Sequence, residues 1–195
     1  MQQSPIPAIL PVSALILAGG AGSRMGGVDK GWLSFQGQPL IEHALRPLRP
    51  YAREILISAN REQARYGALG YAVLSDAESG FPGPLHGLLA GLETCREAWL
   101  AFVPVDCPLL PDDLLPRLWS LRRGYPLVAV ADDQGLVPVM GLIHRRIQGP
   151  LRQYLRSGKR RATEFLASLP HQTLPLADSQ LLNCNYPADL RAESS

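Results

Sequence analysis

The chain of 195 residues has a formal net charge of +2, and 18% of its residues are charged. A balance so close to neutrality gives no reason to expect nucleic acid or a membrane surface as a partner, so any anion must be bound locally. No window approaches the roughly 20 apolar residues of a membrane span, and the first 12 residues lack the basic and apolar regions of a secretory signal.

The length predicts one domain over residues 1–195, with residues 1–12 as a flexible N-terminus. The three cysteines, Cys95, Cys107 and Cys184, are odd in number and widely spaced. This spacing argues against a disulfide framework or a zinc knuckle and favours a reducing, cytoplasmic setting. Cys107 is expected to be a small buried apolar residue rather than a nucleophile.

Short β-rich runs alternate with longer segments of helical periodicity. Strands are predicted at Ser13–Ala18, Glu54–Ser58, Ala72–Leu74, Leu100–Pro104, Leu127–Ala131 and Val137–Ile143. Helices are predicted at about Leu40–Leu48, Arg61–Tyr66, Leu85–Arg96 and Asp112–Leu121, and a basic helical stretch follows Ile143. This alternation predicts an α/β fold: a three-layer α/β/α sandwich with a Rossmann-like, mostly parallel sheet and helices on both faces.

The first predicted strand runs into a glycine-rich stretch, "LILAGGAGSRMGGVDKG", at residues 15–31. Glycines after a strand leave several backbone N–H groups accessible in one concave patch, which is typical of an anion site. Arg24 and Lys30 place two cations on the same loop, where they repel each other unless an anion joins them.

Two familiar phosphate motifs do not match this loop. A Walker loop needs Gly-Lys followed by Ser or Thr, but Lys30 lies between Asp29 and Gly31. A dinucleotide fingerprint starting at Gly20 would need a glycine where Met25 stands. Neither an ordinary NTPase nor a nicotinamide enzyme is therefore favoured.

Three polar residues follow predicted strands, where an open parallel sheet binds its ligands. Asn60 and Asp76 come after the second and third strands, and Asp106 comes after the fourth. A carboxylate at the position of Asp106 can hold Mg²⁺ while phosphate and water complete the coordination. The alternative role for Asp106, capping the next helix, is better filled by Asp112 or Asp113. Asn60 and Asp76 also suit ordinary turns.

Near the end of the chain, "NCN" places Asn183 and Asn185 two residues apart on an extended segment. Both amides then point to one face, either as ligand contacts or as a polar strand edge.

The sequence resembles the molybdenum cofactor guanylyltransferases, within the wider nucleotidyltransferase group. The resemblance rests on "LAGGAGSRMGGVDKG" and "FVPVDCPLLPDDL", and it continues through "ISANR", "LSD", "FPGPLHGLLAGL" and "NCNYPADL". One departure is Val137 before Pro138, where family members frequently carry a histidine. Pterin contacts in the region 130–180 therefore stay unassigned.

This resemblance implies Mg²⁺-dependent transfer of GMP from GTP to the molybdenum-molybdopterin cofactor, giving its guanine dinucleotide and pyrophosphate. It also implies roles for individual residues. Arg24, Lys30 and Asp106 are catalytic, with Asp106 the metal ligand. The nucleotide is bound by Leu17, Ala18, Gly19, Gly20, Lys30, Asn60, Asp76 and Asp106, and the molybdopterin substrate by Arg24, Gly27, Asn183 and Asn185. Transient contact with cofactor-synthesis proteins and with apo-molybdoenzymes or their chaperones is implied as well.

Two alternatives stay open from the sequence. The same scaffold could serve a cytidylyl or sugar-phosphate nucleotidyltransferase, although "LAGG" rather than "LAAG" favours the guanylyl branch by resemblance. The second alternative is a chaperone that binds a nucleotide or the cofactor but catalyses no reaction. In such a protein Asp106 would have no catalytic role.

Overall fold

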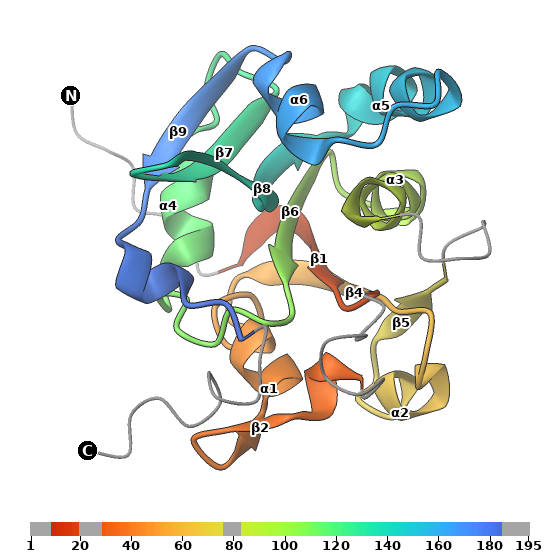
Figure 1. Ribbon diagram of the computed structural model, residues 1–195, viewed down its shortest axis with the longest axis vertical. Coiled ribbons are helices and arrows are strands. Elements are labelled where there is room, and N and C mark those ends of the chain that lie inside the picture. The colour runs from red at the N-terminus through yellow and green to blue at the C-terminus, as the bar shows by residue number, and fades with distance from the viewer. Residues whose placement is uncertain (1–8, 20–28, 76–82, 185–195) are drawn as a thin grey trace.

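The computed structural model of the chain describes residues 9–19, 29–75 and 83–184. They form a seven-stranded sheet of order β5-β4-β1-β6-β8-β7-β9, shown in Figure 1. The seven strands are β1 (Leu10–Leu17), β4 (Ala52–Ser58), β5 (Ala72–Leu74), β6 (Trp99–Pro104), β7 (Leu127–Asp132), β8 (Gly135–His144) and β9 (His171–Pro175).

Within this sheet β8 alone runs against its neighbours. It pairs antiparallel with both β6 and β7, whereas β1 pairs parallel with β4 and β6, and the pairs β4–β5 and β7–β9 are also parallel. The predicted mostly parallel sheet is thus confirmed. A two-residue link joins β7 to β8, and the Asp132 carboxylate supports it by accepting hydrogen bonds from the backbone N–H groups of Gln134 and Gly135.

Helices cover both faces of the sheet, as predicted. On one face lie α1 (Leu40–Leu45) and α4 (Leu114–Leu121), and on the other lie α3 (Pro84–Thr94), α5 (Gln148–Arg156) and α6 (Ala162–Ala167). The short α2 (Gln63–Gly67) adds Tyr66 to the α1 side. The remaining elements are the 3₁₀ turns η2 (Lys30–Trp32), η3 (Arg145–Ile147) and η4 (Asp178–Leu181) and the strands β2 (Ser34–Phe35) and β3 (Gln38–Pro39).

The alternation of side chains along β1 explains how one strand serves two cores. Val12, Ala14 and Ile16 are fully buried on the α1 and α4 face, while Leu15 is buried on the α3 face. Successive side chains of a strand point to opposite faces, so an almost continuous apolar run is what a strand covered on both sides requires.

The six predicted strands and four predicted helices are all present, with ends shifted by a few residues. Besides the reversal of β8, two features were not predicted. The hairpin β2–β3 turns at Gln36 and Gly37, which both adopt positive φ, and β9 pairs with β7 at the edge of the sheet. The capping role expected for Asp112 or Asp113 is absent from α4: Asp113 stands at its N-cap but makes no side-chain cap hydrogen bond.

Among the described helices, none combines the length and the apolar character that a bilayer-spanning segment needs.

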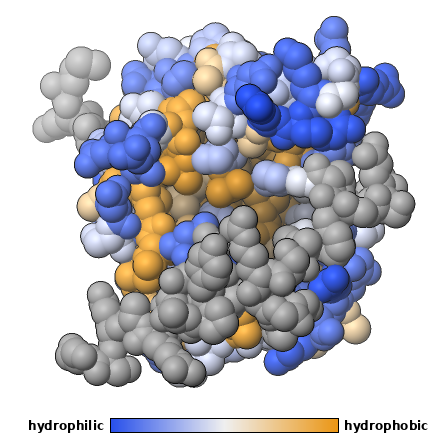
Figure 2. Space-filling model, viewed as in Figure 1, coloured by the Kyte–Doolittle hydropathy of each residue, from blue (hydrophilic) through white to orange (hydrophobic). Residues whose placement is uncertain are grey.

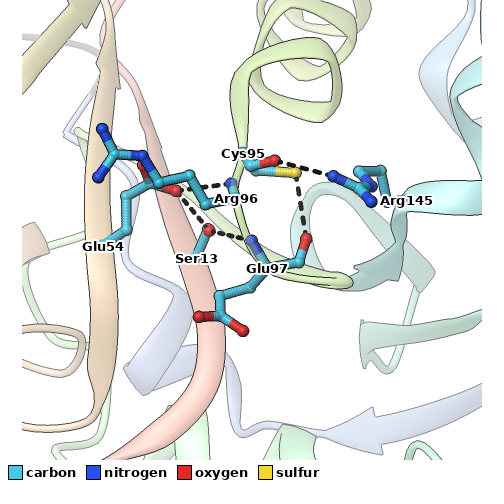
Figure 3. A network of polar contacts seen from close by, with 6 residues as sticks. All are labelled: Ser13, Glu54, Cys95, Arg96, Glu97 and Arg145. Carbon is cyan, nitrogen blue, oxygen red and sulfur yellow. Dashed lines mark hydrogen bonds and ion pairs between the residues drawn. The ribbon is translucent and has the colours of Figure 1, made fainter.

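A polar network ties the strands together at the amino edge of the sheet (Figure 3). The fully buried Ser13 hydroxyl donates to Glu54 on β4 at 2.6 Å and accepts from the backbone N–H of Glu97 at 3.3 Å. The same Glu54 oxygen accepts from the Arg96 N–H at 2.9 Å, and Arg145 donates to the Cys95 carbonyl. The link from α3 to β6 is therefore fixed against the starts of β1 and β4.

Replacing Ser13 with Ala should destabilise the fold by about 1–2 kcal/mol, because it leaves the N–H of Glu97 and one Glu54 oxygen without their buried partner. Urea unfolding followed by circular dichroism measures this. The matched control is Ser120→Ala, since the Ser120 hydroxyl bonds only to Arg117 within its own helix at an exposed position. Equal stabilities of the two variants would contradict a structural role for the network.

Candidate functional site

A cavity of about 350 Å³ opens at the carboxyl edge of the central strands. Leu17 at the end of β1 lies in register with Ser58 on β4 and with Pro104 on β6. Figure 2, viewed as Figure 1, shows hydrophobic side chains at the hollowed centre of this face. The described residues that line the cavity are Leu17, Ala18, Gly19, Lys30, Ser58, Gly83, Pro84, Gly87, Pro104, Val105, Asp106, Val139 and Asn183.

Lys30 and Asp106 form an ion pair in the wall of this cavity. The distance between Lys30 Nζ and Asp106 Oδ2 is 2.7 Å, and the two side chains are 18% and 15% exposed. They come from η2 and from the turn after β6, so the contact spans 76 residues of sequence. Such limited exposure weakens solvent screening, and both groups still reach the cavity.

The backbone around Lys30 is held by Asp29 and Tyr66. One Asp29 oxygen accepts the Gly31 N–H at 3.0 Å and the Tyr66 hydroxyl at 2.5 Å. Tyr66 is fully buried, and its ring packs on Trp32 with centroids 5.0 Å apart. Gly31 is required here, because a Cβ at that position would overlap the Tyr66 hydroxyl. Lys30 thus sits between two anchored residues.

Burial raises the pKa of Asp29, although its hydrogen bonds from Tyr66 and Gly31 act in the opposite direction. Burial, followed by the hydrogen bond to Asp29, raises the pKa of Tyr66. The tyrosine therefore stays protonated and keeps donating to the carboxylate throughout the working range of an enzyme.

The C-terminal part of the described chain is tied to the same corner. The backbone N–H of Cys184 donates to the Asp106 carbonyl at 2.8 Å, and its neighbour Asn183 lines the cavity. Burial, and next the charge of Asp106, raises the pKa of the Cys107 thiol. A buried thiol that resists ionisation is a poor nucleophile, as expected for a packing residue.

The structure brings several of the expected site residues together and leaves one apart. Leu17, Ala18, Gly19, Lys30, Asp106 and Asn183 all line the cavity. Asn60 follows β4 at the same edge of the sheet but does not contribute to the lining. Arg24, Gly20, Gly27, Asp76 and Asn185 lie outside the described residues.

Asp106 suits a hard cation that shares its coordination with a ligand. One of its oxygens contacts Lys30, which leaves the other available to a metal. Within residues 9–19, 29–75 and 83–184, no three His, Cys, Asp or Glu side chains gather as a metal cage. A single carboxylate fits Mg²⁺ held mainly by phosphate and water, and it does not fit a structural zinc ion.

Several residues at this site were not singled out from the sequence. Asp29 and Tyr66 form a hydrogen bond although they are 37 residues apart in the sequence. Apart from the short run Asp-Lys-Gly, no local sequence pattern indicated this contact. Val139 comes from β8 in a region left without assigned contacts. Gly87 and Ser58 lie within the quoted segments "FPGPLHGLLAGL" and "ISANR", where the same signal could have marked them.

Two solved structures illustrate how widely the fold of this chain is shared. Molybdopterin-guanine dinucleotide biosynthesis protein A from Archaeoglobus fulgidus superposes with a TM-score of 0.74 at 21% identity, covering 92% of this chain and 95% of its own. The 4-diphosphocytidyl-2C-methyl-D-erythritol synthase from Anaerococcus prevotii superposes with a TM-score of 0.70 at 12% identity, over 92% of each chain. At these identities the likeness concerns the fold alone.

The sequence comparisons are more specific. Residues 14–173 match the MobA-like NTP transferase domain. A molybdenum cofactor guanylyltransferase from Shewanella sediminis is 42% identical over 182 residues, which cover 91% of this chain and 93% of that protein. The chain therefore belongs to the family of MobA-like NTP transferases, which are nucleotidyltransferases.

Replacing Gly31 with Ala should destabilise the protein by about 1–3 kcal/mol, the usual cost of overpacking, because the new methyl group meets the Tyr66 hydroxyl. Adding Tyr66→Phe removes the clashing oxygen, so the double variant should lose less stability than the sum of the two single variants. Urea unfolding of all four proteins gives this coupling.

The control for this cycle is Gly67→Ala, which adds the same methyl group on α2 with nothing within 4 Å. Strict additivity of Gly31→Ala and Tyr66→Phe would show that the packing around Lys30 does not depend on this contact.

Proposed function

We propose that this protein transfers GMP from GTP to the molybdenum-molybdopterin cofactor and releases pyrophosphate. The observation that carries the proposal is the Lys30–Asp106 pair in a cavity at the carboxyl edge of the sheet, in a chain 42% identical to a molybdenum cofactor guanylyltransferase. A cation next to a carboxylate is what a nucleoside triphosphate with its metal needs.

In the reaction, a terminal phosphate oxygen of molybdopterin attacks the α-phosphorus of GTP. A new P–O–P bond forms, the bond between the α-phosphorus and the bridging oxygen to the β-phosphate breaks, and pyrophosphate leaves with the electron pair. The attacking phosphate is already an anion, so the step needs no general base. Catalysis therefore consists of aligning two anions and neutralising charge at the α-phosphoryl group.

The described residues divide this task between them. Lys30 binds phosphate oxygens of the triphosphate, and its anchored backbone keeps the ammonium group in place. Backbone groups of Leu17, Ala18 and Gly19 bind the nucleotide at the end of β1. Asp106 would hold Mg²⁺, which when bound would supply charge neutralisation at the α-phosphate.

The remaining expected residues belong to the same proposal. Arg24 and Gly20 act on the phosphates from the glycine-rich loop, and Asp76 and Asn60 act on the ribose and the base. The molybdopterin substrate is bound by Arg24, Gly27, Asn183 and Asn185. Of these, Asn183 is supported by its position in the cavity wall.

We also propose that the chain works as one domain in a reducing, cytoplasmic setting and meets cofactor-synthesis proteins and apo-molybdoenzymes or their chaperones transiently. The seven-stranded sheet, which takes strands from the start to the end of the described chain, and the three buried free cysteines support the first two points.

One experiment separates this function from its two alternatives. The purified protein is incubated with Mg²⁺ and each of the four nucleoside triphosphates, with and without molybdenum-molybdopterin, and released pyrophosphate is measured. Pyrophosphate with GTP only, and only when the acceptor is present, is the expected result. Release from CTP instead would indicate a cytidylyltransferase, and binding of GTP without release would indicate a chaperone.

Replacing Asp106 with Ala should lower turnover at least about 100-fold, the scale of losing one preorganised contact to a transition state. The fold should persist, as judged by circular dichroism. Asp112→Ala is the control: this carboxylate is 77% exposed, pairs with Arg46, and should leave turnover unchanged. Full activity of the Asp106 variant would overturn the metal assignment.

A further inference from the structure

Ser58 is a buried polar residue whose hydroxyl has no hydrogen-bond partner among the described residues. In the described chain the buried polar side chains are Ser13, His43 and Ser58. The Ser13 hydroxyl bonds to Glu54 and Glu97, and the His43 ring bonds to the Phe35 carbonyl at 2.9 Å. Ser58 is only 2% exposed, yet no hydrogen bond joins its hydroxyl to any described residue.

The one side-chain N or O atom of the described residues that is fully buried without a partner is Trp32 Nε1, so the Ser58 hydroxyl is open to the cavity. A hydroxyl at such a poorly accessible position costs free energy unless water or a ligand bonds to it. Ser58 lines the cavity that also contains Lys30 and Asp106. Its oxygen therefore has access to whatever fills that cavity. A strand position that needed only a small apolar residue would be filled at no such cost by alanine.

A glycine on the neighbouring helix α3 leaves room for the Ser58 hydroxyl at the cavity wall. Gly87 on α3 faces it, and a Cβ on Gly87 would come within 2.6 Å of Ser58 Oγ and 3.0 Å of Leu17 Cδ2. Because Gly87 has no side chain, α3 approaches the ends of β1 and β4 closely, and Gly87 itself forms part of the lining.

The sheet places Ser58 away from the charged end of the cavity. Leu17 on β1 pairs with Ser58 on one side and with Pro104 on the other, and Asp106 follows Pro104 by two residues. Adjacent strands are about 5 Å apart, so β4 and β6 are separated by roughly 10 Å. That separation matches the distance from the α-phosphate to the far part of a nucleoside. A nucleotide with its phosphates at Lys30 and Asp106 thus extends toward β4.

We propose that the Ser58 hydroxyl forms a hydrogen bond to the nucleoside half of the bound nucleotide and contributes to its recognition. This inference rests on the proposed nucleotide site but not on the chemistry that follows binding. A site that offers a hydrogen bond rejects a ligand that leaves the bond unmade, so Ser58 adds selectivity as well as affinity.

The test compares Ser58→Ala with wild type in two measurements, the stability of the free protein and its affinity for the nucleotide. We expect the substitution to weaken only the affinity. Without nucleotide, the urea unfolding midpoint should stay the same or rise, because no internal hydrogen bond is lost. The dissociation constant of the nucleotide, measured by titration calorimetry with Mg²⁺, should rise about tenfold, the equivalent of one hydrogen bond. The nucleotide used is whichever of the four triphosphates wild type binds most tightly.

Two controls make the result specific. Ser58→Cys keeps the shape of the side chain but bonds weakly, so it should lose affinity as the alanine variant does. Ser13→Ala removes the other buried serine and should lower the unfolding midpoint without changing nucleotide affinity. A lowered midpoint with unchanged affinity in Ser58→Ala would overturn the proposal, since that is the signature of a structural hydroxyl.

Inorganic tripolyphosphate with Mg²⁺ serves as a second ligand. Its dissociation constant should be the same for wild type and Ser58→Ala, because it has no nucleoside half. An equal loss for tripolyphosphate and nucleotide would place Ser58 at the phosphates and overturn the inference. The two proposals can fail separately. If nucleotide binding depends on Ser58 but no pyrophosphate is released in the presence of acceptor, the inference on Ser58 holds and the proposed function is overturned.

Discussion

The ion pair between Lys30 and Asp106 is the contact on which the arrangement of this site depends. Its two members belong to segments that follow different strands, so it forms only if β1 and β6 are parallel neighbours in the observed register. A largely buried pair of this kind contributes little net stability, because desolvation offsets the attraction. Its value is positional: each charge keeps the other in place at the cavity wall.

Much of the protein around this pair serves to place it. Asp29 and Tyr66 fix the backbone on both sides of Lys30, and the Cys184 N–H bonds to the carbonyl of Asp106. At the other edge of the sheet, the network around Ser13 and Glu54 holds the starts of the same strands. The strands that lead to the cavity are thus tied together at their starts as well.

The sequence predicted the layers of the fold and the cavity's two charged residues, because both depend on local signals. Apolar runs ending in glycine or aspartate mark the carboxyl ends of strands, and this signal together with the family resemblance marked Lys30 and Asp106. Contacts between distant segments leave no such signal, which is why the bond from Tyr66 to Asp29 was missed. Asn60 follows β4 at the expected edge of the sheet, and Ser58, the last residue of β4, lines the cavity. The reversal of β8 was also not foreseen, since periodicity does not give strand direction. The turn sequence "DDQG", from the last residue of β7 to the first residue of β8, was the only sequence feature that indicated this reversal.

The close approach of Gly31 to the Tyr66 hydroxyl links two positions that lie far apart in the chain. A side chain at position 31 can be accepted only if position 66 loses its hydroxyl, and that loss also removes the hydrogen bond to Asp29. In an alignment of relatives these two columns should therefore covary. Relatives that lack a tyrosine at position 66 should therefore hold the residue equivalent to Lys30 in place by other contacts.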